Sequence, residues 1–513
     1  MGDKLINYYQ QHVKKTWKLA FAAAFLCCIL VHIYKFTNTL PNFDAVTNVY
    51  FDQDMTISGR WLLQYACGIS SYFDLPWLIG LLCAVYLGLI TVVIVELYEI
   101  QNPIVILLVA GILACSPSTT EILFFEYTAD GYLLGLLFSA LSALYSCKSE
   151  KIQHSAFSGI LLCASCAIYQ SNISFGAILC VCFFLNKLFN DEMDGVNAVR
   201  WIVKHILIYG VFLAIYYAIW KVMLLVKNVE ATTYHGISSV AQFSLTTMIR
   251  GLKNSLIYLR NFFLDWTLLD RSITLYTILN ALFLVLFAVI LAITAIKSRV
   301  IFKPVSCALM IIALLVIVPI LSIWCLFSAQ VDYSPRMYHS VCVLYVFAIL
   351  LFDKWANTKF STPFALLILV VIFNFAVMAN ISYQYLDDSY EKSYYLGSRM
   401  MERIETYEED TFETIAFVGD REEIVRLSGT EPSDRIHLLT HQLFRDIMYY
   451  HSRIYPFMES VFDLDIPSAT KEDRNYLEAH PYIQGMEAWP SENSIQVIDG
   501  ILVVKVGEID TLS

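Results

Sequence analysis

Residues 76–97 read Pro76-Trp-Leu-Ile-Gly-Leu-Leu-Cys-Ala-Val-Tyr-Leu-Gly-Leu-Ile-Thr-Val-Val-Ile-Val-Glu-Leu97, with Glu96 as their one charged side chain. A helix of about 20 predominantly apolar residues spans the hydrocarbon core of a bilayer. This stretch therefore predicts a membrane-spanning helix. The whole chain agrees, because 58% of its 513 residues are hydrophobic, 15% are charged and the mean hydropathy is +0.60. Such a composition excludes an ordinary soluble protein, and no nucleic-acid partner is expected.

Further apolar segments predict a polytopic α-helical membrane protein with about 11 transmembrane or re-entrant helices. The short segments need shielding by neighbouring helices, since unpaired backbone cannot face lipid. The other long segments are Trp17–Tyr34, Trp201–Val226, Ile273–Ile296, Pro304–Leu326 and Phe364–Ala379, and the short ones are Pro103–Cys115, Gly131–Tyr145, Phe157–Tyr169, Ile173–Leu185 and Val341–Phe352.

Lysine and arginine in the short loops set the orientation, because such residues favour the cytoplasmic side. All the basic short loops fall on the side of the amino terminus, which we expect to be cytoplasmic. An odd number of spans then places the carboxyl terminus outside. The first span lacks a convincing cleavage site for a signal peptide. The basic loop residues include Lys14, Lys148, Lys187, Lys303 and Lys354.

The composition changes sharply after Ala379. Residues Ile381–Ser513 contain 26 acidic and 11 basic side chains, and no cysteine. The sequence therefore predicts two domains, a membrane domain at 1–379 and an acidic extracytoplasmic α/β domain at 380–513. Within the second, Thr414–Asp420 is typical of a buried strand that ends in a glycine turn, and Ser494–Val506 predicts a hairpin around Asp499-Gly500.

The polar residues of the predicted outer loops are candidates for a site. Asp44, Asp52, Asp54, Arg60 and Trp61 follow the first span closely. The alternative is that each is a solvated loop charge, which is common for surface aspartate.

Three further polar residues belong to the same outer face. Asp130 and Gln170 lie at membrane depth, where a polar group is costly unless it faces a cavity or pairs with another group. Tyr127 adds an aromatic ring nearby in the sequence. This outer face carries richer chemistry than the short basic loops, so we expect the site there.

The segment Ser239–Phe263 alternates apolar residues with Arg250, Lys253 and Arg260, which predicts an amphipathic helix at the membrane interface. These cations either clamp a lipid phosphate or anchor the helix on acidic headgroups. Arg336 is the better single candidate for a phosphate contact, because Pro335 fixes the turn before it.

The thirteen cysteines lie between Cys27 and Cys342, mostly inside apolar spans. Pairs such as Cys163 and Cys166 have no histidine or acidic partner nearby in the sequence. Free cysteine is a common buried apolar residue, so no metal ligands are predicted.

Several short motifs, in their order along the chain, resemble the bacterial GtrII-type glucosyltransferase family. They are Ser58-Gly-Arg-Trp61, Tyr72-Phe-Asp-Leu-Pro76, Tyr127 to Tyr132 around Asp130, and Tyr169-Gln170. The resemblance covers roughly 1–379. It implies a GT-C-like enzyme of the bacterial cytoplasmic membrane that takes a sugar, glucose in the family, from a polyprenyl-phosphate carrier. The acceptor would be a surface polysaccharide such as O-antigen or another envelope glycan on the outer face. Implied partners are membrane lipids, a flippase and an enzyme that makes the donor.

The resemblance also suggests roles for the candidates. The base would lie in the first outer loop, with Asp44 first because its neighbours are apolar, and Asp52 second. Arg60, Arg336 or the pair Arg250 and Lys253 would meet the lipid phosphate. The aromatic rings of Trp61 and Tyr127 would pack on the sugar, and Asp130 and Gln170 would complete the substrate site. The lipid-linked sugar is then the donor, and no metal is required.

Two other classes of protein share this polytopic character. A lipid-linked sugar flippase or a polysaccharide transporter would also have buried polar residues, and a structural scaffold could display the acidic tail. Transporters usually carry internal repeats, and we find none. The large polar outer loops favour chemistry at one face of the membrane.

Overall fold

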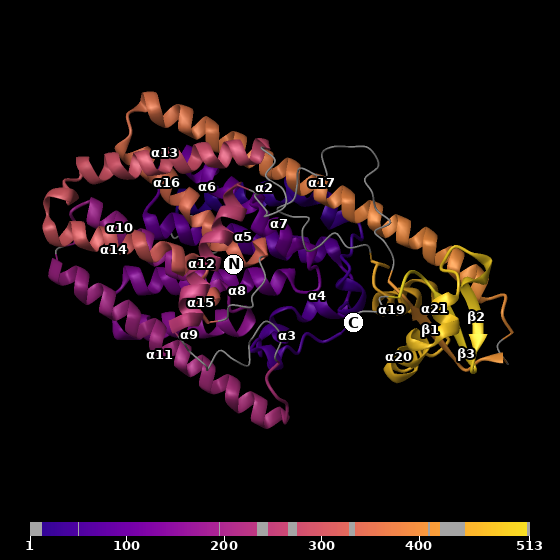
Figure 1. The fold of residues 1–513 in the computed structure, drawn as a ribbon. Coiled ribbons are helices and arrows are strands. Elements are labelled where there is room, and N and C mark those ends of the chain that lie inside the picture. The colour runs from indigo at the N-terminus through magenta and orange to yellow at the C-terminus, as the bar shows by residue number, and fades with distance from the viewer. Residues whose placement is uncertain are drawn as a thin grey trace, which may run out of the picture. The chain divides into compact units, whose positions relative to one another are not determined.

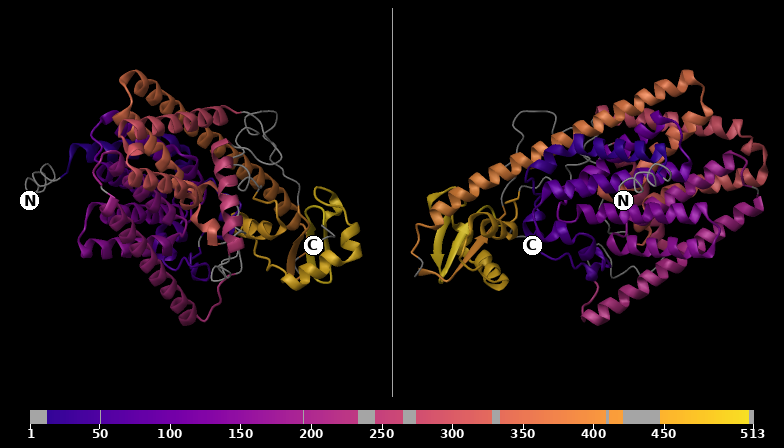
Figure 2. Two further views of the ribbon diagram at one scale, coloured as in Figure 1. Left: turned by 60° about the vertical axis from the view of Figure 1, so that its left-hand side comes forward. Right: turned by 180° about the vertical axis from the view of Figure 1, so that it is seen from behind.

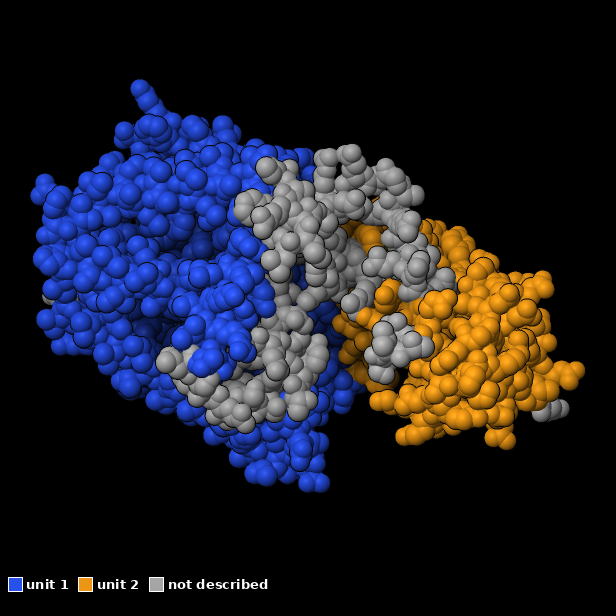
Figure 3. All heavy atoms as spheres, viewed as in Figure 1, with its two compact units in different colours: residues 1–38, 52–380 blue, residues 39–51, 381–513 orange. Residues whose placement is uncertain are grey.

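A computed structural model of the chain describes residues 13–49, 51–193, 195–232, 245–264, 274–327, 334–408, 411–420 and 447–509. The chain forms two compact units (Figure 3). The first comprises Met1–Asn38 and Asp52–Asn380, and the second comprises Thr39–Phe51 and Ile381–Ser513. The acidic tail is therefore joined in its unit by a short segment that follows the first helix.

The first unit is built of helices (Figure 1). Its longer helices are α2 (Lys15–Thr37), α5 (Pro76–Tyr98), α6 (Pro103–Cys115), α8 (Ala129–Lys148), α9 (Ile152–Ile168), α10 (Asn172–Phe189), α11 (Gly195–Lys227), α12 (Leu245–Leu264), α13 (Leu275–Lys297), α14 (Pro304–Leu321), α16 (Cys342–Trp355) and the beginning of α17 (Thr358–Ile404). Its shorter elements are η2 (Thr56–Ser58), α3 (Leu63–Ala66), α4 (Gly68–Tyr72), α7 (Pro117–Phe124), η4 (Val300–Phe302), α15 (Ile323–Phe327) and η5 (Pro335–Val341).

The described residues contain 10 helical segments that are long and apolar enough to cross a membrane, and one shorter apolar helix, Ile152–Ile168. These segments coincide with the predicted spans, so the predicted polytopic helical fold is confirmed. Many of their large apolar side chains are exposed, among them Leu30, Leu225 and Phe373. Such surfaces suit lipid contact, because acyl chains are as apolar as leucine.

Local sequence explains where several helices begin. Pro76, Pro103 and Pro304 occupy first positions of their helices, where the missing N–H costs nothing. Asn102 caps α6 by accepting a hydrogen bond from Ile104 N at 3.1 Å. Within the bundle, α5 packs against α2 and α8, and α8 also packs against α9 and α10. Figure 2 shows from two further sides how the indigo and purple helices of this part of the chain run alongside one another.

The connection between the predicted spans Pro103–Cys115 and Gly131–Tyr145 contains a buried helix. The polar run from Ser116 to Glu121 belongs mainly to α7, and every residue of α7 is buried. Ser116 caps this helix by accepting from Thr119 N at 3.2 Å, and Pro117 begins it. The apolar residues that end α7 are buried with it, which draws the polar side chains of the same short helix into the protein.

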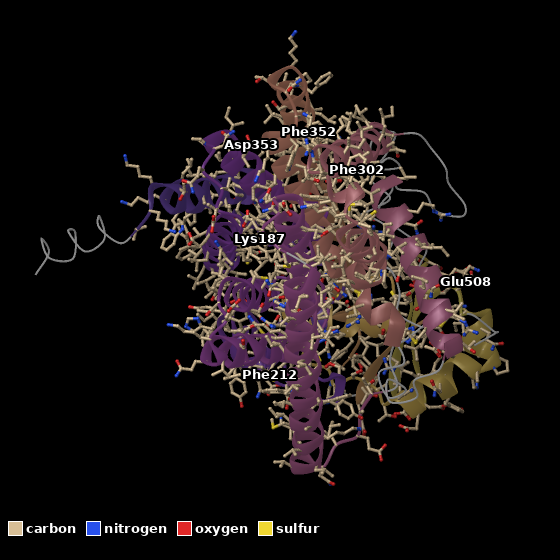
Figure 4. All side chains as sticks on the ribbon, turned by 90° about the vertical axis from the view of Figure 1, so that its left-hand side faces the viewer. Lys187, Phe212, Phe302, Phe352, Asp353 and Glu508 are labelled. Carbon is tan, nitrogen blue, oxygen red and sulfur yellow. The ribbon has the colours of Figure 1, made fainter. Side chains whose placement is uncertain are left out.

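Lysines from the predicted cytoplasmic loops gather at one end of the first unit. Figure 4 looks onto this end, where Lys187 and Asp353 are labelled. Both line a pocket of about 450 Å³. Lys148 pairs with Glu99 there, and this ion pair lowers the pKa of Glu99.

The second unit contains a sheet of three strands among its described residues. Its elements are η1 (Ala45–Thr47), the end of α17, β1 (Thr414–Val418), α19 (His451–Phe462), α20 (Lys471–Ala479), α21 (Pro481–Gly485), η8 (Glu492–Ser494), β2 (Ile495–Ile498) and β3 (Ile501–Lys505). The strand order is β1-β3-β2, with β1 parallel and β2 antiparallel to β3.

Two local predictions in this unit are confirmed. Strand β1 ends at Gly419 with a φ of 78°, and the hairpin between β2 and β3 turns at Asp499 and Gly500, which have φ of 51° and 77°. Positive φ at both central residues is the signature of the tight hairpin turn that Asp-Gly favours. The small α/β fold of the tail is thereby confirmed as well.

Candidate functional site

The loop after Asp52 is fastened to the turn between α9 and α10 and to α11. Gln170 Nε2 donates to Ser58 O at 2.6 Å, and the Tyr216 hydroxyl donates to Gly59 O at 2.9 Å. Gly59 has a φ of 83°, and a Cβ on it would lie 2.6 Å from the Tyr216 hydroxyl and 2.8 Å from Gln170 Nε2. Only glycine fits both this backbone conformation and this space.

The fastened loop positions Arg60. Its Nη1 donates to the Tyr132 hydroxyl at 3.2 Å, and its Nε donates to Gln170 Oε1 at 3.4 Å. The guanidinium also lies over the ring of Tyr169, 4.9 Å from the ring centre. Tyr169 and Tyr132 stack with their ring centres 4.4 Å apart. The structure thus brings the predicted residues Arg60 and Gln170 together with two tyrosines.

Arg336 is held from its backbone, not from its side chain. Its N–H donates to Glu121 Oε2 at 2.5 Å, and the Ser334 hydroxyl donates to Glu121 Oε1 at 2.8 Å. The guanidinium lies 3.7 Å from the centre of the Phe125 ring. Its Nε and Nη1 are buried and have no hydrogen-bond partner. Buried polar groups are normally paired, so two strong donors are oriented here for a partner that the described residues do not supply.

Tyr169 links the two arginines. Tyr169 lies beneath the Arg60 guanidinium and is also within electrostatic reach of Arg336. Tyr127 is within electrostatic reach of Arg336 as well. We call Arg60, Arg336, Tyr132, Tyr169 and Gln170 the arginine–tyrosine cluster.

A further unpaired side chain lies one turn beyond Arg336 on η5. His339 is buried, and neither of its ring nitrogens has a hydrogen-bond partner in the part of the chain that the structure describes. Its ring stands edge-on to Phe175, with the ring centres 5.7 Å apart. Sequence analysis missed His339, because a lone histidine near an apolar span carries no spacing signal.

Two buried carboxylates lie close to the start of α8. Asp130, in the first turn of α8, accepts from the Ser70 hydroxyl and from Gly131 N. Glu126 forms an ion pair with Lys35 at 2.6 Å, and both side chains are buried. Sequence analysis missed the Lys35 partner, although a lysine that ends an apolar span is a usable signal. Asp130 and Gln170 do not pair with each other, but each has hydrogen-bond partners of its own.

The carboxylates of the first loop have three different surroundings. Asp52 is exposed and makes no hydrogen bond or ion pair with the described residues. Asp54 forms an ion pair with Lys227 at 2.5 Å. Partial burial would raise the pKa of Asp54, but hydrogen bonds from Lys227 and Thr56 outweigh that effect and lower it.

Asp44 belongs to the second unit, whereas Asp52 and Arg60 belong to the first. Its Oδ1 is 2.8 Å from Arg453 Nη2, and Arg453 also donates to the Thr47 hydroxyl. The apolar setting expected for Asp44 is therefore wrong, because a side chain from α19, remote in sequence, supplies a cation. Its catalytic role stays a prediction.

Three predicted site residues remain, Trp61, Arg250 and Lys253. Trp61 is half-buried, and its indole N–H has no hydrogen-bond partner. Arg250 and Lys253 are exposed on α12, and no hydrogen bond or ion pair joins them to the arginine–tyrosine cluster in the described part of the chain. Residues 239–244 of the predicted amphipathic helix, and 332 and 333 of the loop before Arg336, lie outside the described residues.

The first unit is thus a multi-pass membrane protein of helices that holds arginine, tyrosine and carboxylate side chains near one set of helix ends. The sequence profile of the family described as Glucosyl transferase GtrII matches residues 33–352. The chain belongs to this family, and the predicted resemblance is confirmed. No curated protein and no solved structure matches the chain.

Proposed function

We propose that this protein is a GT-C-like enzyme that moves a glucosyl residue from a polyprenyl-phosphate carrier to an envelope glycan such as O-antigen, on the outer face of the bacterial cytoplasmic membrane. Membership of a glucosyl transferase family supports the sugar transfer. The single observation in the structure that favours a lipid-phosphate donor is the guanidinium of Arg336, whose Nε and Nη1 are buried without a hydrogen-bond partner among the described residues.

The chemistry needs a cation at the leaving group. When the bond from the sugar to the phosphate oxygen breaks, negative charge grows on the phosphate, and fixed donors aimed at that charge lower the barrier. A guanidinium presents its Nε and one Nη as a fork that matches two phosphate oxygens. Arg336 has these two donors to offer, and Arg60, which lies over the Tyr169 ring, adds a second positive charge.

The chemistry also needs a base for the acceptor hydroxyl. We retain Asp44 as the first choice and Asp52 as the second. Asp52 has no hydrogen bond or ion pair with the described residues, so it can accept a proton without losing any partner among them. Asp44 has Arg453 beside it, which stabilises its charged form but leaves the carboxylate 30% exposed. If neither acts, Asp130 and Glu121 are the buried alternatives.

The cations of α12 remain open between two roles. Arg250 and Lys253 are exposed, as are Ile249 and Leu252 beside them. This pattern supports a helix that lies in the interface with anionic headgroups, and it equally allows a second contact with the carrier phosphate.

The outer location rests on the positive-inside rule. The arginine–tyrosine cluster lies near the helix ends opposite to those that carry Lys148, Lys187 and Lys303. Basic short loops favour the cytoplasm, so the cluster would face outward, where lipid-linked sugars are used to modify surface glycans. A flippase and a donor-synthesising enzyme are then required partners.

The test is a donor panel. The purified full-length protein is incubated with polyprenyl-phosphate glucose, the corresponding galactose and mannose lipids, and UDP-glucose, together with lipid-linked O-antigen or another envelope glycan as acceptor. Consumption of polyprenyl-phosphate glucose with glucose appearing in the acceptor supports the proposal. Transfer from UDP-glucose alone, or movement of the intact lipid across a vesicle without loss of its sugar, would replace it with a nucleotide-sugar enzyme or a flippase.

A further inference from the structure

Three side chains with metal-binding atoms meet inside the helical unit, away from the arginine–tyrosine cluster. They are Cys147 in the last turn of α8, Cys180 in the middle of α10 and His205 near the start of α11. Cys147 Sγ lies 3.6 Å from Cys180 Sγ and 3.8 Å from His205 Nε2. All three ligand atoms lie within 4.8 Å of one another, and they form the one such group found among the described residues.

These separations match the edges of a metal coordination tetrahedron. With metal–sulfur bonds of about 2.3 Å and metal–nitrogen bonds of about 2.0 Å, two sulfurs lie about 3.8 Å apart and a sulfur and a nitrogen about 3.5 Å apart. The observed 3.6 Å and 3.8 Å differ from these values by a few tenths of an ångström. Small rotations of the cysteine side chains would place an ion at bonding distance from all three atoms.

The orientation of His205 supports the same conclusion. Its Nδ1 lies 2.9 Å from Trp201 O, so this nitrogen carries the hydrogen and donates it to the carbonyl. The lone pair of Nε2 then points towards the thiols. A metal-binding histidine almost always has its other nitrogen held in this way. The indole of Trp201 stacks on the imidazole with ring centres 3.6 Å apart, which fixes the plane of the ring.

The surroundings suit a bound ion that can be exchanged. Cys180 and His205 are 4% and 7% exposed, so water is largely excluded from their side. Cys147 is half-buried at the end of α8 and leaves a route from the helix ends. The Tyr209 hydroxyl, 3.9 Å from Cys180 Sγ, stands beside the group as a further oxygen donor.

We propose that Cys147, Cys180 and His205 bind one thiolate-preferring d¹⁰ metal ion, Zn²⁺ or Cu⁺, and that the ion fastens α8, α10 and α11 together at the end of the bundle that carries the basic loops. On binding, each thiol releases its proton to water as its sulfur bonds the ion, and neutral His205 bonds through Nε2. Three ligands satisfy Cu⁺, while Zn²⁺ takes a fourth, which water or Tyr209 supplies. This site is independent of the proposed glucosyl transfer.

The spacing of cysteine and histidine along the sequence predicts no metal ligands, because spacing reveals only ligands that are close together in the chain. The three residues come from three helices, so no short motif joins them. Cys163 and Cys166 are closer in sequence, yet no histidine joins them in a metal-binding group of the described residues. They provide a matched control, because both lie in α9 within the same unit.

The test uses the full-length protein, purified with and without a chelator. Metal content is measured per chain, and binding is followed by titration with Zn²⁺, with Cu⁺ under reducing conditions, and with Co²⁺, whose thiolate charge-transfer absorption reports sulfur ligation. We expect one ion per chain, and protection of two thiols from a thiol reagent when the ion is bound. Zn²⁺ or Cu⁺ as the tighter ion identifies the occupant, and either supports the proposal.

Variants separate a built site from general thiol binding. Loss of a residue that only hydrogen-bonds to a metal ligand already weakens metal affinity by about 10 to 100-fold, so Cys180→Ser and His205→Ala, which remove ligands, should each weaken it by at least ~10²-fold. Cys166→Ser should leave it unchanged. Circular dichroism and size-exclusion chromatography show that each variant is folded, and Cys180→Ser nearly preserves size. Three results would overturn the proposal. They are a parent protein that binds no ion, a loss of metal affinity in Cys166→Ser equal to that in Cys180→Ser, and a Cys147–Cys180 disulfide in protein alkylated before purification.

Discussion

Arg336→Gln removes the guanidinium, whose Nε and Nη1 are buried without a hydrogen-bond partner among the described residues, and leaves a shorter, uncharged polar side chain. The backbone N–H of residue 336 still donates to Glu121, since that hydrogen bond does not involve the side chain. The variant should therefore retain the start of η5 while losing the contact that we assign to the carrier phosphate.

The expected magnitude follows from the number of free donors. A hydrogen bond to a charged group contributes about 1.5–3 kcal/mol, and Arg336 offers two such donors. Loss of both therefore costs about 3–6 kcal/mol, or ~10² to 10⁴-fold in kcat/KM. The assay measures glucose transfer at limiting polyprenyl-phosphate glucose with the purified protein. Arg336→Lys keeps the charge but not the fork, so its loss should be intermediate.

Thermal unfolding separates this role from a structural one. The substitution removes the contact with Phe125, which is worth about 1–2 kcal/mol. It also removes two buried donors without partners, each of which costs about 1–3 kcal/mol in the folded protein. The second effect is the larger, so Tm should stay level or rise while transfer falls.

Two results would refute this reasoning. One is a folded Arg336→Gln protein with the parental kcat/KM, and the other is a fall in Tm that accounts for the lost activity. Lys253→Gln is the comparison for the exposed helix α12. Equal transfer at limiting donor would assign Lys253 to headgroup anchoring, whereas a matching loss would make it a second phosphate contact.

Asp44→Asn should slow transfer by ~10² to 10⁴-fold, the range that a general base supplies, while Arg453→Gln, which removes the partner of Asp44, should cost far less. Equal losses in both variants would show that the ion pair only holds the segment in place. Gly59→Ala should strongly lower the transfer rate, because a methyl group at this φ of 83° would collide with the side chains of Tyr216 and Gln170. A rate equal to that of the parent protein would mean that the loop has no part in catalysis. In intact cells, a cysteine at Ser468 should react with an impermeant reagent above the background of the unmodified chain, and one at Ser149 should not; the reverse pattern would invert the topology.

Much of the fold follows from local sequence. Each span is an apolar run long enough to cross a bilayer, and each must form its backbone hydrogen bonds internally, so composition alone specifies a helix. The Asp499-Gly500 hairpin and the glycine turn after β1 are equally local, because their φ values depend on one or two residues. The α7 helix was not predictable from its polar residues, since its burial depends on η5 and the neighbouring helices that pack on it.

The candidate site was predictable only in part. Sequence supplied Arg60, Gln170 and Arg336 from their position near predicted outer loops and from the family resemblance. It did not supply the stacking of Tyr132 on Tyr169, which gives the two arginines a common neighbour. Nor did it show that Asp44 has Arg453 as a partner, because the two residues are 409 positions apart in the chain.

By itself, then, the sequence determined the membrane spans, the acidic tail with its hairpin, and the family, because each rests on runs or motifs of neighbouring residues. Only the tertiary structure decided which buried polar groups are paired, which donors of Arg336 are left over, and that Cys147, Cys180 and His205 meet. The physical reason is that an apolar run forms its helix from its own residues. A side-chain hydrogen bond or a set of metal ligands instead joins residues of different helices, so it depends on how the whole bundle packs.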